Sequence, residues 1–136
     1  MDAYFRVSFF TIPTFRTTGF FSLLQFVFFR TAGGNELVRD WLSTLSVPDR
    51  KAVGIDLRTV QAGWPVGMPV CRPLGDGLYE VRTAISDRRT VRVLLLLSGN
   101  TLVALHGFVK KTQKTPDKEL AVARQLQSDY LRSLQS

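Results

Sequence analysis

The sequence predicts an α+β fold in which an N-terminal helical hairpin and a C-terminal helix pack on a small antiparallel sheet. Apolar residues recur at helical spacing between residues 35 and 61 and again after residue 116. Three strand-like segments joined by short polar links lie between them. A chain of 136 residues fits one domain with a single core.

The hairpin is predicted from two apolar stripes and their start signals. Ala32-Gly33-Gly34-Asn35 is a turn, and Asn35 is a good N-cap for the first helix. The second helix begins at Pro48, a residue favoured in the first turn, and runs to about Gln61. The inward residues are Leu37, Val38, Trp41, Leu42 and Leu45 in the first helix, and Val53, Leu57 and Val60 in the second.

The sheet is predicted from short β-rich segments. Phe26 to Thr31 is expected as the first strand, and the Gly- and Pro-rich stretch from Gly63 to Gly77 as a loop without a regular element. Short links join the remaining strands, so they must form an antiparallel meander. These strands are Leu78 to Ile85, Thr90 to Leu97 and Thr101 to Val109.

The C-terminal helix is expected to begin with Thr115 as its cap and Pro116 at its first position. Its buried face is predicted to consist of Leu120, Ala123, Leu126, Tyr130 and Leu134, which recur at helical spacing.

The N-terminal segment is unusually aromatic, since nine of the ten phenylalanines lie within the first 29 residues. Its longest uncharged run, Thr17 to Phe29, is too short for a membrane-spanning helix, and no A-x-A cleavage pattern follows it. Its single proline, Pro13, and its scattered polar residues do not fit an amphipathic helical stripe, which argues against a membrane-active toxin. We expect residues 1–25 to be an extension, or to follow from an upstream start codon, and residues 26–136 to be the folded domain.

Positive charge is concentrated in one part of the chain. The formal net charge is +7, and the stretch from Arg88 to Pro116 contains no acidic residue. Such a stripe favours a polyanionic partner, although a merely solvated basic face is the alternative. Its charged residues are Arg88, Arg89, Arg92, Lys110, Lys111 and Lys114, and it also holds the single histidine.

Cys71 is the only cysteine, so the chain has no intrachain disulfide and no cysteine cluster for a metal. We expect a cytoplasmic protein that needs neither a metal nor a cofactor. Cys71 stands between Pro69 and Pro73 without an orienting signature, which argues against a thiol nucleophile.

The register of the strands predicts a row of cations. A three-residue first turn would pair Ile85 with Arg89 and place Arg82 opposite Arg92. A three-residue second turn would add His106 to this row, whereas a two-residue Gly99-Asn100 turn would shift His106 out of line.

Adjacent arginines repel across a sheet unless an anion such as phosphate lies between them. His106 is suited to move a proton near neutral pH. The alternative is structural: Arg82 pairs with Glu80 or Asp87, and His106 is a satisfied edge residue.

A second basic cluster, Lys110-Lys111-Thr112-Gln113-Lys114, runs from a strand end into a helix N-terminus, where the helix dipole also favours anions. Nucleic-acid backbone is the expected anion, and a solvated lysine turn is the alternative.

Several segments, taken in order, resemble the phage-derived Gp49-like, HigB-type toxins of the RelE/HigB superfamily. The resemblance covers about residues 26 to 134. It is carried by residues 28–35 (FFRTAGGN), 67–69 (GMP), 74–82 (LGDGLYEVR), 92–94 (RVL) and above all 106–116 (HGFVKKTQKTP).

This resemblance implies a RelE-like fold and a toxin of a type II toxin–antitoxin system. Such toxins cleave mRNA without a metal, usually on the ribosome: the ribose 2′-hydroxyl attacks the neighbouring phosphate and leaves a 2′,3′-cyclic phosphate. The implied partners are mRNA, the ribosome and a helix-turn-helix, HigA-like antitoxin, with which the toxin could form a higher-order complex.

The resemblance also implies roles for individual residues. Arg82 and Arg92 would contact the scissile phosphate, and Lys110 would stabilise the transition state or donate a proton. His106 is a candidate general acid or base, and Glu80 is a weaker candidate for the base. RNA backbone would be held by Arg72, Lys111 and Lys114. The alternative function is a non-catalytic RNA-binding or phage-associated interaction protein on the same fold.

Overall fold

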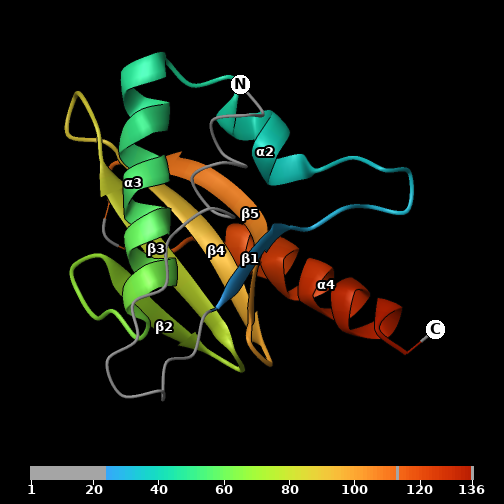
Figure 1. The fold of residues 1–136 in the computed structure, drawn as a ribbon. Helices are drawn as coiled ribbons and strands as arrows, with labels where there is room; N and C mark the ends of the chain where they lie inside the picture. Colours follow the sequence, from blue (N-terminus) through green and yellow to red (C-terminus); the bar gives the residue numbers. More distant parts are fainter. Residues whose placement is uncertain (1–23, 113, 136) are drawn as a thin grey trace.

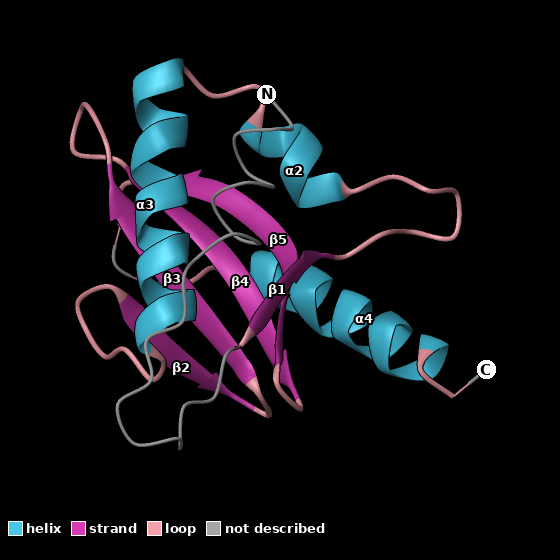
Figure 2. Ribbon diagram, viewed as in Figure 1, coloured by secondary structure: helices cyan, strands magenta, loops and turns pink. Residues whose placement is uncertain are grey.

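The computed structural model describes residues 24–112 and 114–135, which form a five-stranded sheet with helices on both faces (Figure 1). The strand order is β1-β5-β4-β3-β2. Helices α2 and α3 cover one face, and α4 crosses the other (Figure 2). In chain order the elements are β1 (Gln25–Phe28), α2 (Leu37–Leu42), α3 (Val47–Gly63), β2 (Cys71–Gly75), β3 (Leu78–Ala84), β4 (Thr90–Ser98), β5 (Thr101–Lys110) and α4 (Asp117–Ser133).

The predicted fold class is confirmed: the chain is α+β, and its helical hairpin, sheet and C-terminal helix are consistent with a RelE-like fold. The three strands of the predicted meander differ from β3, β4 and β5 by at most one residue at each end. They run antiparallel, as their short links require.

Two predictions about the sheet are wrong. The stretch expected to be only a loop contains β2, which pairs with β3 from Cys71 opposite Val81 onward. Proline is tolerated there because β2 is an edge strand, where Pro73 can lack an amide proton at little cost. The sheet is also mixed, since β1 is parallel to β5 with Gln25 opposite Thr101.

Helix ends also differ from the predictions. Helix α2 begins after Glu36, not after Asn35, and α3 begins after Ser46, whose hydroxyl accepts a hydrogen bond from the Asp49 amide. At α4 the residue in the N-cap position is Pro116, and within the described residues no side chain makes a capping hydrogen bond to this helix. Leu134, expected to be buried, follows α4 and is 58% exposed.

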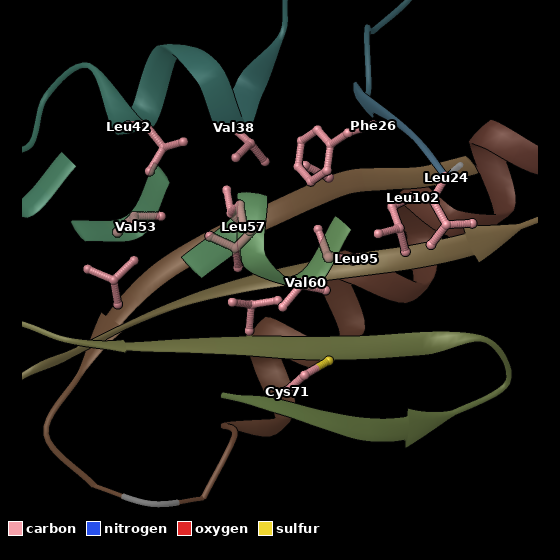
Figure 3. Close-up of a cluster of buried hydrophobic side chains, with 14 residues drawn as sticks. Leu24, Phe26, Val38, Leu42, Val53, Leu57, Val60, Cys71, Leu95 and Leu102 are labelled. Atoms are coloured by element: carbon pink, nitrogen blue, oxygen red, sulfur yellow. The ribbon is translucent and has the colours of Figure 1, made fainter. Parts of the chain in front are cut away.

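The sheet separates two layers of apolar side chains. Figure 3 shows the first, a cluster that contains Val53, Leu57 and Val60 of α3 and Leu95 of the sheet; these α3 residues are all buried, as predicted. The second layer lies under α4, where Ala123 is buried against the sheet. Burial on both faces explains why β4 reads as an almost continuous apolar run.

Gly107 lets α2 approach the sheet closely. A Cβ atom at this position would lie 2.6 Å from Cζ3 of Trp41, closer than real carbon contacts allow. The indole ring therefore packs directly over the backbone of β5.

The predicted phenylalanine-rich extension lies almost entirely outside the described residues. Leu24, the first described residue, is buried in the layer beneath α3. Between residues 24 and 135, with residue 113 left out, none of the helices has the length and apolarity needed to cross a bilayer.

Candidate functional site

Arg82 and Arg92 face each other on neighbouring strands, as the register predicted. The turn between β3 and β4 closes with a hydrogen bond from the Ile85 amide to the Arg89 carbonyl at 2.9 Å. This three-residue turn fixes the pairing, so Arg82 of β3 lies opposite Arg92 of β4.

Glu80 lies between the two arginines and resolves the repulsion expected of them. Its Oε1 is 3.7 Å from Nε of Arg82, and its Oε2 is 3.7 Å from Nη1 of Arg92. The hydroxyl of Thr115 donates a hydrogen bond of 2.5 Å to the same Oε2. Thr115, which was predicted as a helix cap, thus donates its hydrogen bond to a residue of the sheet instead. The ion pair between Arg82 and Glu80 is the one expected in the structural alternative.

This cluster is almost closed to solvent. The side chains of Glu80 and Arg92 are fully buried, whereas that of Arg82 keeps 11% of its surface exposed. Burial lowers the pKa of Arg92; Glu80 opposes this effect, while Arg82 and Arg72 add to it. In this conformation Arg82, and not Arg92, presents surface to a ligand.

Several polar atoms of the cluster have no hydrogen-bond partner among the described residues. They are Oε1 of Glu80 and both Nε and Nη1 of Arg92. The third nitrogen, Nη2 of Arg92, donates to the carbonyl of Thr112 beyond the end of β5. Buried groups left unsatisfied are costly, and in native proteins they are often associated with function.

His106 is not part of this row, so the predicted alignment of Arg92 with His106 is wrong. Phe108 lies opposite Arg92, and His106 lies opposite Leu94. Ser98 pairs with Thr101 across a two-residue turn, and a bulge between Leu94 and Leu95 shifts the register further.

The imidazole of His106 belongs to the attachment of α4 to the sheet. Its Nε2 lies 2.7 Å from Oε1 of Glu119, and its ring is tilted toward that of Phe108. The structure therefore fits the interpretation of His106 as a satisfied residue, and Leu94 separates it from Glu80 in the sheet.

The other predicted basic residues lie on β2, at the end of β5 and in the segment before α4. Lys110 ends β5 and is half-buried, while Lys111 and Lys114 are exposed in the segment that leads to α4. Arg72 is exposed on the edge strand β2 and pairs in register with Glu80. Arg82 is thus the partly exposed arginine of the cluster, and a guanidinium group is suited to bind a phosphodiester.

Cys71 is the first residue of β2, not part of a loop, and is buried. Burial, followed by the nearby Glu80 carboxylate, raises the pKa of its thiol to about 11. A thiol protonated at neutral pH is a poor nucleophile, which agrees with the expectation from the sequence. Within residues 24–112 and 114–135, no three His, Cys, Asp or Glu side chains gather as a metal site would require.

Sequence reasoning missed Thr115 and the carbonyl of Thr112 as parts of the site. Thr115 precedes Pro116 and Asp117, a pattern that also marks a helix start, so the local sequence could not distinguish a cap from a long-range contact. The only signal was the need of a buried Glu80 for a donor.

Comparison with known protein families identifies the family to which the chain belongs. Residues 40–128 match the family model described as phage derived protein Gp49-like (DUF891). No curated protein matches the chain. The matched region includes α3, all the strands except β1, the arginine pair with Glu80 and most of α4. The chain therefore belongs to the phage-derived Gp49-like family, which is part of the RelE/HigB-type toxin group.

Proposed function

We propose that this protein is the toxin of a type II toxin–antitoxin system and cleaves mRNA, in the manner of HigB, while the mRNA is being translated. Membership in the Gp49-like family supports the toxin class. The observation that carries the nuclease proposal is the opposed pair Arg82 and Arg92, both held by Glu80.

The proposed reaction is an internal transesterification. The 2′-hydroxyl of the ribose loses its proton and attacks the adjacent phosphorus, while the bond from phosphorus to the 5′-oxygen breaks. The leaving oxygen takes up a proton, so the products are a 2′,3′-cyclic phosphate and a 5′-hydroxyl. The negative charge that builds on the phosphate oxygens is where fixed cations accelerate the reaction most.

Some of the site residues are assigned to contact RNA, and the others orient the residues that do so. We assign Arg82 to the scissile phosphate, because its guanidinium fork suits phosphate oxygens and part of it is exposed. Lys110 stabilises the transition state or protonates the leaving oxygen. Glu80 and Arg92, which are fully buried, orient Arg82 from behind. His106 could act as a general acid or base only if its imidazole moved away from the Glu119 carboxylate.

RNA backbone outside the cleavage point is assigned to Arg72, Lys111 and Lys114. All three are exposed, and they approach the cluster from β2 and from the segment before α4. Contacts of this kind give affinity without base specificity. The proposed partners are mRNA and the ribosome in the cytoplasm, and a helix-turn-helix antitoxin that holds the toxin inactive in a complex.

A second function fits one observation. Glu80 and Arg92 neutralise each other inside the protein, which is also what a purely structural pair would do. On this alternative the chain binds RNA or a phage-associated partner through its exposed basic residues and does not cleave RNA.

The test is induced expression in bacteria of the wild type, Arg82→Ala and Arg132→Ala. Arg132 is an exposed arginine near the end of α4 that pairs with Asp129, so its replacement is the matched control. Growth would be followed, mRNA 5′ ends mapped, and the 3′ ends of the fragments examined for cyclic phosphate.

Growth arrest with codon-phased cleavage in the wild type and Arg132→Ala, but not in a soluble Arg82→Ala, is the expected result. Arrest without new mRNA ends would favour the binding protein. Absence of both arrest and cleavage in soluble wild type would overturn the nuclease proposal.

A further inference from the structure

The turn between β3 and β4 holds two residues other than glycine in a backbone conformation that side chains disfavour. Asp87 has a φ of 61°, and Arg88 has a φ of 59°. The Arg89 amide donates a hydrogen bond of 3.3 Å to the Ser86 carbonyl, so Asp87 and Arg88 are the two central residues of a tight turn. Positive φ at both central positions is the mark of a type I′ turn, whose twist matches that of the strands it joins.

Arg88 is an unfavourable residue for its place in this turn. The second central position of a type I′ turn is usually glycine, because a Cβ atom in the left-handed region crowds the neighbouring backbone. Asp87 suits the first position better, since a short polar side chain tolerates this region. Strained residues of this kind cluster at functional sites, so the arginine side chain needs an explanation other than the stability of the turn.

The fold engages the neighbouring arginine but not Arg88. Nη2 of Arg89 lies 3.1 Å from Oγ of Ser86 and 4.0 Å from Oδ2 of Asp49 at the start of α3. Arg88 is exposed, and within residues 24–112 and 114–135 no hydrogen bond or ion pair holds its guanidinium. Figure 1 shows the turn projecting beyond the end of β3. The charge of Arg88 is therefore presented to a partner outside this part of the chain.

The turn lies at the same end of the sheet as the proposed phosphate site. The last pair of the hairpin joins Ala84 to Thr90, and Lys110 of β5 lies opposite Thr90. The row of Arg82 and Arg92 lies two residues before this pair, which is about 7 Å along the strands. An RNA strand bound at that row has only a short way to extend before it reaches the turn.

We propose that the turn between β3 and β4 is a further RNA-contact site, at which Arg88 binds a backbone phosphate other than the scissile one. The proposal deepens the proposed function and rests on it, because RNA is the partner in both. Messenger RNA and ribosomal RNA present the same phosphodiester, and the planar fork of arginine suits its oxygens. The experiment distinguishes these two sources.

The experiment compares the wild type with Arg88→Gly, Arg88→Asn and Arg88→Lys. Arg58→Ala is the control, because Arg58 is an exposed arginine of α3 at a distance from the turn in sequence. The Kd is measured at several salt concentrations for two probes: a single-stranded 2′-O-methyl RNA, which cannot be cleaved, and ribosomes that carry the same RNA as messenger. Thermal unfolding of each variant gives its Tm.

Arg88→Gly should be more stable than the wild type and yet bind RNA more weakly. Its Tm should rise by about 2–5 °C, because glycine adopts positive φ without strain. Its Kd should increase about threefold to tenfold near ~0.1 M salt, and the slope of log K against log[salt] should decrease by about 1. Weaker binding by a more stable variant cannot result from damage to the fold.

The other variants separate charge from backbone conformation. Arg88→Asn removes the charge at a residue that also tolerates positive φ, so its Kd should increase as in Arg88→Gly. Arg88→Lys keeps the charge and should bind within about threefold of the wild type. Arg58→Ala should leave the Kd for both probes unchanged.

Asp87 provides a test of opposite sign. Its exposed carboxylate stands next to Arg88 in the turn and repels a phosphate bound there. Asp87→Asn retains a residue suited to the first central position and removes this charge. Its Kd should therefore decrease about twofold to threefold, and an unchanged Kd would contradict an RNA contact at the turn.

The outcomes distinguish the source of the phosphate and separate the two proposals. Weaker binding of Arg88→Gly to both probes identifies messenger RNA, and weaker binding to the ribosome alone identifies ribosomal RNA. An unchanged Kd and salt slope for both probes overturns the contact. A wild type that binds RNA without cleaving it overturns the nuclease, and the Kd of Arg88→Gly then still decides whether the turn contacts RNA.

Discussion

Glu80 and Arg92 lie 3.7 Å apart, and both side chains are fully buried. Each ion alone would be very costly to keep away from water, so each depends on the other. The pair nevertheless lacks the hydrogen bonds that would satisfy all its atoms. Such a pair adds little net stability, but removing one partner is expensive. Net stability therefore does not explain why the chain keeps this buried pair.

Arg92→Ala should lower the free energy of unfolding by about 3–5 kcal/mol, because it removes the fully buried one of the two arginines that neutralise the buried Glu80. The double variant Glu80→Gln, Arg92→Met should recover most of this stability. Urea unfolding at pH 7 measures both. Arg132→Ala, which removes an exposed pair, should change stability by less than about 1 kcal/mol. Equal destabilisation in the single and double variants would contradict this account.

Lys110→Ala should reduce cleavage by about a hundredfold or more, the scale expected when a group that stabilises the transition state is removed. His106→Gln should cleave within about threefold of the wild type, since glutamine can still hydrogen-bond to Glu119. Single-turnover assays over pH 5 to 8 compare them. A large decrease in the cleavage rate of His106→Gln, together with an altered pH profile, would show that His106 acts as a general acid or base.

Lys111→Ala and Lys114→Ala should each weaken RNA binding and lower its salt dependence. Each removes one exposed cation, so the slope of log K against log[salt] should decrease by about 1 for each phosphate that the variant no longer neutralises. Titration of a single-stranded 2′-O-methyl RNA at several salt concentrations measures this slope. Lys51→Ala, on the exposed side of α3, is the control, and an equal effect there would indicate unspecific attraction.

The buried thiol of Cys71 should make stability fall at high pH. Its pKa is about 11 in the folded protein against 9.0 for the ordinary group, so the folded state holds a proton that the unfolded state releases above pH 9. The contribution is complete below pH 9 and disappears as pH rises through 11, by about 2–3 kcal/mol. Unfolding of the wild type and Cys71→Ala from pH 8 to 11 checks this; parallel curves would refute it.

Gly107→Ala should destabilise the fold by about 1–3 kcal/mol, because its methyl group would overlap the ring of Trp41. Trp41→Leu in the same chain should relieve part of this destabilisation. Thermal unfolding of the single and double variants gives the coupling between the two positions. If the changes in stability of the two single variants simply add in the double variant, the close packing of the Trp41 ring on β5 is not the cause of the destabilisation.

The sequence predicts local elements well wherever one pattern dominates. The inward stripe of α3 and the strands β3 to β5 follow from periodicity and short links, and the pairing of Arg82 with Arg92 follows from one turn length. Strand β2 was missed because glycine and proline mark loops, and only its pairing with β3 makes it a strand.

The site was harder to predict because it depends on register and distance in space. One bulge and a two-residue turn were enough to remove His106 from the row. Burial of Arg92 and its hydrogen bond to the Thr112 carbonyl arise from the path of the chain between β5 and α4, which no local pattern specifies. The sequence predicted that Arg82 and Arg92 lie opposite each other, but not which of the two keeps part of its surface exposed.

The parallel pairing of β1 with β5 also sets the order in which the molecule can be completed. Gln25 is synthesised long before its partner Thr101, so β1 cannot pair until β5 has been synthesised. Phe26, buried in the finished core, has no sheet to cover it during that interval. Residues 101–115 then supply both the partner of β1 and the donor to Glu80. The covering of Phe26 and the completion of the hydrogen bond to Glu80 thus belong to the same final stage of synthesis.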